Sequence, residues 1–180
     1  MRSAEPSPLL TRTTLRFRAR TLHRWIDGAI TSNARRLGDS LNRDDVGGTI
    51  IADEFVVDGG DERRGDVPGG TPLGALNINV VLFMFPIETG PPPARDPFAW
   101  VKKHPERVKV GTGPYEIEGD LFMVEGVRLK EMIATARPVF IVLAAATVRR
   151  LDDPTFIENR GAVFVNRRLM DYLVGMSSDR

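Results

Sequence analysis

The two halves of this chain correspond to each other in sequence. Five blocks of similar sequence recur in the same order, with a spacing of 91, 92 and finally 87 positions. The matched blocks are 16–19 with 107–110, 26–30 with 117–121, 36–41 with 128–133, 49–52 with 141–144, and 75–79 with 162–166. Ordered self-similarity indicates one structural unit that occurs twice. The alternative, that two unrelated segments share one hydrophobic pattern, stays open on the sequence alone.

Each half has the hydrophobic pattern of strands around one short helix. Phe17 and Ala19 alternate with arginines, which is typical of a half-buried strand. Gly28 and Gly119 occupy matching positions in the next strand, where glycine indicates a bulge or a close backbone approach. Helices are expected over 32–42 and 125–136, and apolar strands over 50–57, 76–85, 140–148 and 162–170. We therefore predict an α+β, β-rich fold with two similar small units, each a β-barrel or strongly curved sheet with one inserted helix.

A proline-rich segment separates the two halves. Three consecutive prolines at 91–93 favour an extended, semi-rigid spacer. We predict a flexible tail at 1–12, a first repeat unit at 13–88, a linker at 89–96 and a second repeat unit at 97–176.

Two segments carry a resemblance to known families. The sequence R-L-G-D-S-L-N at 36–42, together with F-I-V-L-A-A-A-T-V at 140–148, resembles a small uncharacterised bacterial domain family with an R-L-x-D-x-L-N motif. G-A-V-F-V-N-R at 161–167 is remotely similar to the last strand of Sm-like small barrels. The first family has no established activity, so its resemblance implies architecture and a bacterial origin. Fold likeness to the second does not imply RNA binding.

Composition excludes several classes of protein. The chain has no cysteine, which excludes disulfide frameworks, thiolate metal sites and cysteine nucleophiles. Its apolar runs are much shorter than the roughly 20 residues that span a bilayer, and residues 1–10 lack the apolar core of a secretory signal. We expect a cytoplasmic protein without membrane insertion. No residues point to a metal, a cofactor or a catalytic group, and whether the chain is an enzyme stays open, with a non-enzymatic role favoured.

The most basic segment is the N-terminal one. Residues 1–24 contain six arginines and one acidic residue. Arg16, Arg18 and Arg20 alternate along one strand and are expected to share a face. Such a stripe can contact phosphates or an acidic protein surface, or can simply be solvated.

Two carboxylates interrupt an apolar strand of the first half. Asp53 and Glu54 stand where the second half has alanines. Neighbouring residues of a strand point to opposite faces, so the two carboxylates are unsuited to act as one catalytic pair. One of them is a candidate to line a polar groove; the alternative is an ordinary surface charge.

Alternation fails at the end of the first half. Residues 80–85 form a continuous apolar run, and a strand of this kind is covered on both faces. We expect Val80, Leu82, Phe83 and Phe85 to contact the other unit or a second chain.

These patterns favour a non-enzymatic interaction or scaffold protein, a subunit of a larger assembly that binds a protein partner or itself. The first alternative is a nucleic-acid-binding protein that uses the N-terminal arginine stripe. The second is a small-ligand sensor or an enzyme with a pocket between the two units.

Overall fold

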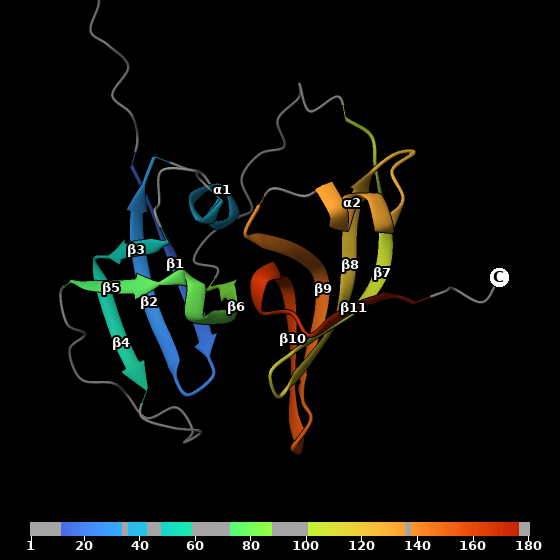
Figure 1. The fold of residues 1–180 in the computed structure, drawn as a ribbon. Helices are drawn as coiled ribbons and strands as arrows, with labels where there is room; N and C mark the ends of the chain where they lie inside the picture. Colours follow the sequence, from blue (N-terminus) through green and yellow to red (C-terminus); the bar gives the residue numbers. More distant parts are fainter. Residues whose placement is uncertain are drawn as a thin grey trace, which may run out of the picture.

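A computed structural model describes residues 12–33, 36–42, 48–58, 73–87, 101–135 and 138–176 of the protein (Figure 1). In the first half the elements are β1 (Thr13–Thr21), β2 (Trp25–Ser32), α1 (Leu37–Leu41), β3 (Thr49–Ala52), β4 (Glu54–Asp58), β5 (Gly74–Asn77), the 3-10 helix η2 (Ile78–Val80) and β6 (Val81–Pro86). In the second half they are β7 (Lys103–Thr112), β8 (Tyr115–Val124), α2 (Leu129–Thr135), β9 (Phe140–Arg150), β10 (Asp153–Asn166), η3 (Arg167–Leu169) and β11 (Tyr172–Gly175). The tail predicted at 1–12, apart from residue 12, and the linker predicted at 89–96 lie outside the described residues.

One large antiparallel sheet runs through both halves. Its nine strands have the order β11-β7-β8-β9-β10-β6-β1-β2-β4, and β3 and β5 form a separate two-stranded sheet. The α+β, β-rich class is therefore confirmed. The expected barrel is wrong for the described residues, because the sheet continues from one half into the other through β10 and β6 and stays open, instead of closing within each half.

Several predicted strands are interrupted. The strand expected at 50–57 divides at Asp53 into β3 and β4, whereas the matching β9 continues through a bend at Ala145, where φ is 45°. The strand expected at 76–85 is broken by η2. Asn77 causes this break, because its side chain accepts a hydrogen bond from Asn79 N and caps the 3-10 helix. Such local side-chain bonds leave no signal in the hydrophobic pattern.

The glycines expected to mark close backbone approaches do so. A Cβ on Gly28 would lie 2.5 Å from Phe17 Cζ and 3.2 Å from Glu54 O. A Cβ on Gly119 would lie 2.8 Å from Leu143 Cβ, at a register shift between β8 and β9. Only glycine therefore leaves room for β4 beside Gly28 and for β9 beside Gly119.

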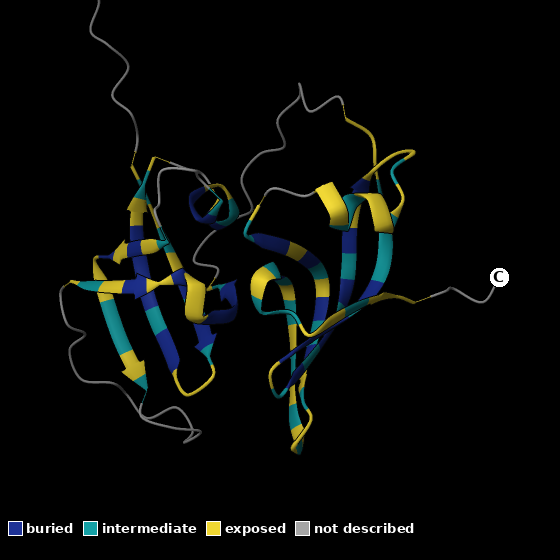
Figure 2. Ribbon diagram, in the orientation of Figure 1, coloured by how far each residue is buried: buried dark blue, intermediate teal, exposed yellow. Residues whose placement is uncertain are grey.

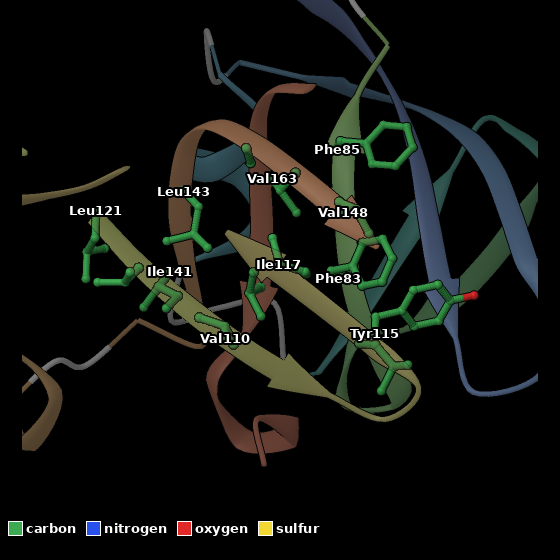
Figure 3. Close-up of a cluster of buried hydrophobic side chains, with 14 of the residues drawn as sticks. Phe83, Phe85, Val110, Tyr115, Ile117, Leu121, Ile141, Leu143, Val148 and Val163 are labelled. Carbon is green, nitrogen blue, oxygen red and sulfur yellow. The ribbon is translucent and has the colours of Figure 1, made fainter. Parts of the chain in front are cut away.

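The buried side chains form two clusters, and each cluster contains residues from both halves. Figure 2 shows buried positions along the strands of both halves, and Figure 3 shows one of the two clusters, in which Phe83 and Phe85 of the first half lie with Tyr115 of the second. The cluster of the first half includes Phe140 and Phe164 of the second half. The cluster of the second half includes Trp25, Leu82 and Phe83 of the first half. The two halves therefore complete each other's hydrophobic cores.

Candidate interaction surface

The two halves join where β6 pairs with the end of β10. Phe164 lies opposite Met84, and Val165 lies opposite Phe83. All residues from Val81 to Phe85 are buried, because β6 has a strand on each side and a hydrophobic cluster on each face. We call this pairing the internal joint.

The apolar run selected from the sequence lies at this joint. Leu82, Phe83 and Phe85 are buried in the cluster of the second half, with Tyr115 beside Phe83 (Figure 3). Val80 differs from them, because it belongs to η2 and is 52% exposed.

Two asparagines, which the sequence did not single out, bind across the joint. Asn166 is fully buried, and its Nδ2 donates hydrogen bonds of 3.0 Å to Ile78 O and to Val81 O. Its Oδ1 accepts from Arg168 N and caps η3. Asn42, at the end of α1, forms two hydrogen bonds with the backbone of Phe140. The one sequence signal for Asn166 is the recurrence of asparagine at the end of the last matched block.

The hydrogen bonds of the capping asparagines change the alignment of the last matched block, 75–79 with 162–166. The spacing of 87 pairs Asn79 with Asn166, but Asn77 and Asn166 are the residues that cap equivalent 3-10 helices, and they are 89 positions apart. The first strands keep a spacing of 91: Ile87 N donates to Arg16 O, and Met176 N donates to Arg107 O. The same spacings relate the β1–β6 and β7–β11 pairings, in which Phe83 opposes Arg20 and Tyr172 opposes Gly111.

The arginine stripe is paired with acidic side chains and buried at one end. Arg16 binds Glu54 through two contacts of 2.7 and 3.0 Å. Arg18 lies 3.6 Å from Asp27 and 3.8 Å from Asp58. These carboxylates offset the positive charge on which the nucleic-acid alternative depends.

Arg20 departs most from the expected common surface face. It is 4% exposed, and its guanidinium lies 5.2 Å from the Trp25 ring centre and 5.4 Å from that of Tyr115. A register shift between Arg20 and Thr21 occurs where β1 pairs with β6. Because Tyr115 belongs to the second half, this burial depends on the packing between halves.

Asp53 and Glu54 each stabilise the break between β3 and β4. Asp53 Oδ2 accepts a 3.0 Å hydrogen bond from Thr31 N, and Glu54 binds Arg16. In the second half Arg107, the counterpart of Arg16, donates to Ala145 O at the bend of β9. The structure thus brings Arg16 and Glu54 together but does not bring the two carboxylates together in one site.

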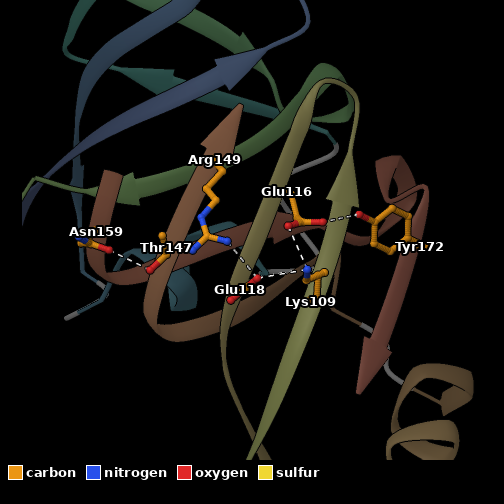
Figure 4. A network of polar contacts seen from close by, with 7 residues as sticks. All are labelled: Lys109, Glu116, Glu118, Thr147, Arg149, Asn159 and Tyr172. Carbon is orange, nitrogen blue, oxygen red and sulfur yellow. Dashed lines mark hydrogen bonds and ion pairs between the residues drawn. The ribbon is translucent and has the colours of Figure 1, made fainter. Parts of the chain in front are cut away.

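A charged network crosses the outer face of the second half (Figure 4). Lys109 Nζ lies 3.1 Å from Glu116 Oε1 and 3.2 Å from Glu118 Oε1, and Arg149 lies 3.3 Å from Glu118. Tyr172 OH donates to Glu116 Oε2 at 3.1 Å, which attaches β11 to this network. The sequence pattern did not single out these residues.

The network shifts the acid–base behaviour of its members. Burial raises the pKa of Glu116, but hydrogen bonds from Lys109 and Tyr172 outweigh it and hold that pKa below its ordinary value. Hydrogen bonds to Glu116 and Glu118 raise the pKa of Lys109. Burial and the bond to Glu116 raise the pKa of Tyr172. These shifts favour the charged forms of Glu116 and Lys109, so the network connects neighbouring strands through ion pairs.

Within the described ranges, no group of three or more His, Cys, Asp and Glu side chains is arranged to hold a metal ion. No helix in the described part of the chain is long and apolar enough to cross a membrane. Comparisons with protein-family models, with curated proteins and with solved structures found no match to this chain.

Proposed function

We propose that this chain is a non-enzymatic interaction or scaffold protein and a subunit of a larger assembly. In this proposal the chain itself consists of two copies of one structural unit. The observation that carries the proposal is the internal joint. There a strand of one unit extends the sheet of the next, and side chains of each unit complete the core of the other. A unit that associates in this way is suited to form extended assemblies by strand pairing.

The repeated hydrogen bonds support the tandem origin of the two units. The capping asparagines, the backbone bonds of Ile87 and Met176, and the pairings of β6 and β11 recur at matching positions. Similar hydrophobic patterning alone would not reproduce two side-chain caps and two edge bonds in the same places.

The exposed end of the sheet supports an interaction role. β11 is an end strand, and Tyr172, Val174 and Met176 at this edge are 41%, 48% and 36% exposed. Edge strands with apolar side chains readily pair with another polypeptide.

Site-specific photo-crosslinking tests the proposal. A photoreactive phenylalanine analogue replaces Val174 on β11 in the full chain, and the matched control replaces Ile157, which is 55% exposed on β10. Irradiation in cells that naturally produce the chain should join position 174, far more than position 157, to a polypeptide identified by mass spectrometry. An absence of crosslinks at 174, with migration of the native chain at its own mass of 20.0 kDa in extracts, would contradict the proposal.

A further inference from the structure

We infer that the partner of this chain is a second copy of itself, bound head to tail, with β11 of one copy paired to β5 of the next. The inference rests on the proposed function and names the partner. It would repeat between chains the internal joint that β6 and β10 form within the chain.

The first part of the argument is the equivalence of β11 and β6. Each strand follows an asparagine-capped 3-10 helix and pairs with the first strand of its own half, at matching register. β6 uses its second edge to pair with β10. β11 has no strand on its second edge in the described part of the chain.

The second part is the equivalence of β5 and the end of β10. β5 pairs with β3 as the end of β10 pairs with the start of β9, and each strand ends at a capping asparagine. Among the described strands, β5 pairs with β3 alone. The chain therefore presents one edge of each kind that its internal joint brings together.

Asn77 is suited to the same contact as Asn166. The Oδ1 of each caps its own 3-10 helix, and the Nδ2 of Asn166 then reaches across the internal joint to two carbonyls, Ile78 O and Val81 O. Asn77 is exposed. In the next copy the carbonyls equivalent to those two belong to Arg167 and Met170.

The internal joint also specifies the register between copies. Phe164 opposite Met84 becomes Ala75 opposite Leu173, and Val165 opposite Phe83 becomes Leu76 opposite Tyr172. Ala75 and Tyr172 are exposed in the single chain.

The geometry favours association between chains over closure within one chain. β5 lies at the left of the molecule in Figure 1, and β11 lies on the right, beyond the internal joint. Because the two edges are different surfaces, their contact is heterologous and leaves one edge of each kind open at the ends of a dimer. Repetition then produces a closed ring or an open filament.

The contact between chains should be weaker than the internal joint. Thr49 pairs with Asn77 as Phe140 pairs with Asn166, so the strand pairing makes Thr49, and not residue 48, the counterpart of Phe140. The position equivalent to Asn42 is Ala134, so the paired side-chain bonds between α1 and β9 have no counterpart between chains. We therefore expect assembly that depends on concentration.

Light-scattering mass of the full chain, from about 1 to about 500 µM, tests the inference. The wild type should rise from 20.0 kDa to multiples of that mass. Asn77→Asp keeps the cap but places a carboxylate oxygen against two carbonyls, and Val174→Glu places a charge on the β11 edge beside Lys109, its neighbour on β7. Each variant should stay at 20.0 kDa. The matched controls Asn159→Asp and Ile157→Glu, on the outer part of β10, should assemble like the wild type.

Mixing the two variants distinguishes head-to-tail contact from any symmetric contact. The Asn77→Asp chain keeps a sound β11 and the Val174→Glu chain keeps a sound β5, so the mixture should form one joint and stop at twice the chain mass of 20.0 kDa. Circular dichroism checks that both variants fold. If Asn77→Asp does not fold, Asn77→Ser takes its place, because serine can also cap the 3-10 helix η2 but lacks the amide donor.

Three results would overturn the inference: a wild-type mass of 20.0 kDa at every concentration, variants that assemble like the wild type, or a mixture that stays single-chained. Photo-crosslinking at position 174 separates this failure from failure of the proposed function. Crosslinks to a different protein would leave the interaction role standing and exclude self-assembly. An absence of crosslinks, with the native chain migrating at its own mass of 20.0 kDa, would contradict both.

Discussion

The side chain of Asn42 acts as a strand partner for the backbone of Phe140. Its Nδ2 donates to Phe140 O at 3.1 Å, and its Oδ1 accepts from Phe140 N at 2.9 Å, across 98 positions of sequence. One amide group thus satisfies both backbone polar groups at the start of β9 and connects α1 of the first half to the second half.

Asn42→Ala should therefore destabilise the whole chain. The substitution removes both hydrogen bonds and leaves a partly buried N–H and C=O without them, for a loss of about 2 kcal/mol in the free energy of unfolding. Urea unfolding followed by circular dichroism measures the loss. Asn159→Ala, which removes one exposed bond with Thr147, is the matched control and should lose under about 1 kcal/mol. Equal losses would contradict the role of Asn42.

Phe164→Ala should destabilise the half to which Phe164 does not belong by sequence. Phe164 is 7% exposed, and it packs in the cluster of the first half with Phe17 and Met84. The cavity should lower the free energy of unfolding by about 3–5 kcal/mol. Hydrogen exchange should accelerate in β1 and β2 as well as in β10. Protection that falls in the second half alone would show that the two cores are independent.

Arg20→Gln should lower the stability of the folded chain. The guanidinium is buried between the rings of Trp25 and Tyr115, so its loss should lower the free energy of unfolding by about 2 kcal/mol. The exposed Arg24→Gln is the matched control, with a change within about 0.5 kcal/mol. If the two variants unfold alike in urea, Arg20 is not held by this packing.

Lys109→Met should remove a stabilisation that depends on pH. Lys109 and Tyr172 hold the pKa of Glu116 below its ordinary value of 4.5 despite burial, so this stabilisation is fully present above pH 4.5 and is lost as the pH falls through the lowered pKa. We expect the variant to be about 1 kcal/mol less stable than the wild type at pH 7, and the difference to shrink as the pH falls below 4.5.

At alkaline pH the stability difference between Lys109→Met and the wild type should persist. The pKa of Lys109 is raised above 10.5, so its charge, and with it the difference between the two proteins, should persist to pH 9 and beyond. Lys130→Met, on the exposed surface of α2, is the matched control and should change stability little at any pH. A difference for Lys109→Met that stays constant from pH 7 to pH 3 would contradict this pairing.

Local features that depend on neighbouring residues could be predicted from the order of the amino acids. Alternation at Phe17 and Ala19 specified β1, and Gly28 and Gly119 marked the close approaches. The continuous run at 80–85 indicated a strand covered on both faces, which β6 forms from Val81 onward. The α+β, β-rich class followed from such patterns, because the alternation of apolar and polar residues predicts which positions of a strand are buried.

The way in which the two halves meet could not be predicted from local patterns. The pairing of β6 with β10, the insertion of Phe140 and Phe164 into the other core, and the burial of Arg20 under Tyr115 depend on contacts between residues far apart in sequence. The polar contacts of Asn42, Asn166 and Lys109 depend on side-chain direction in the same way. An open sheet replaced the expected barrels because a strand edge pairs with whichever compatible edge the fold brings to it, and hydrophobic periodicity does not specify that edge.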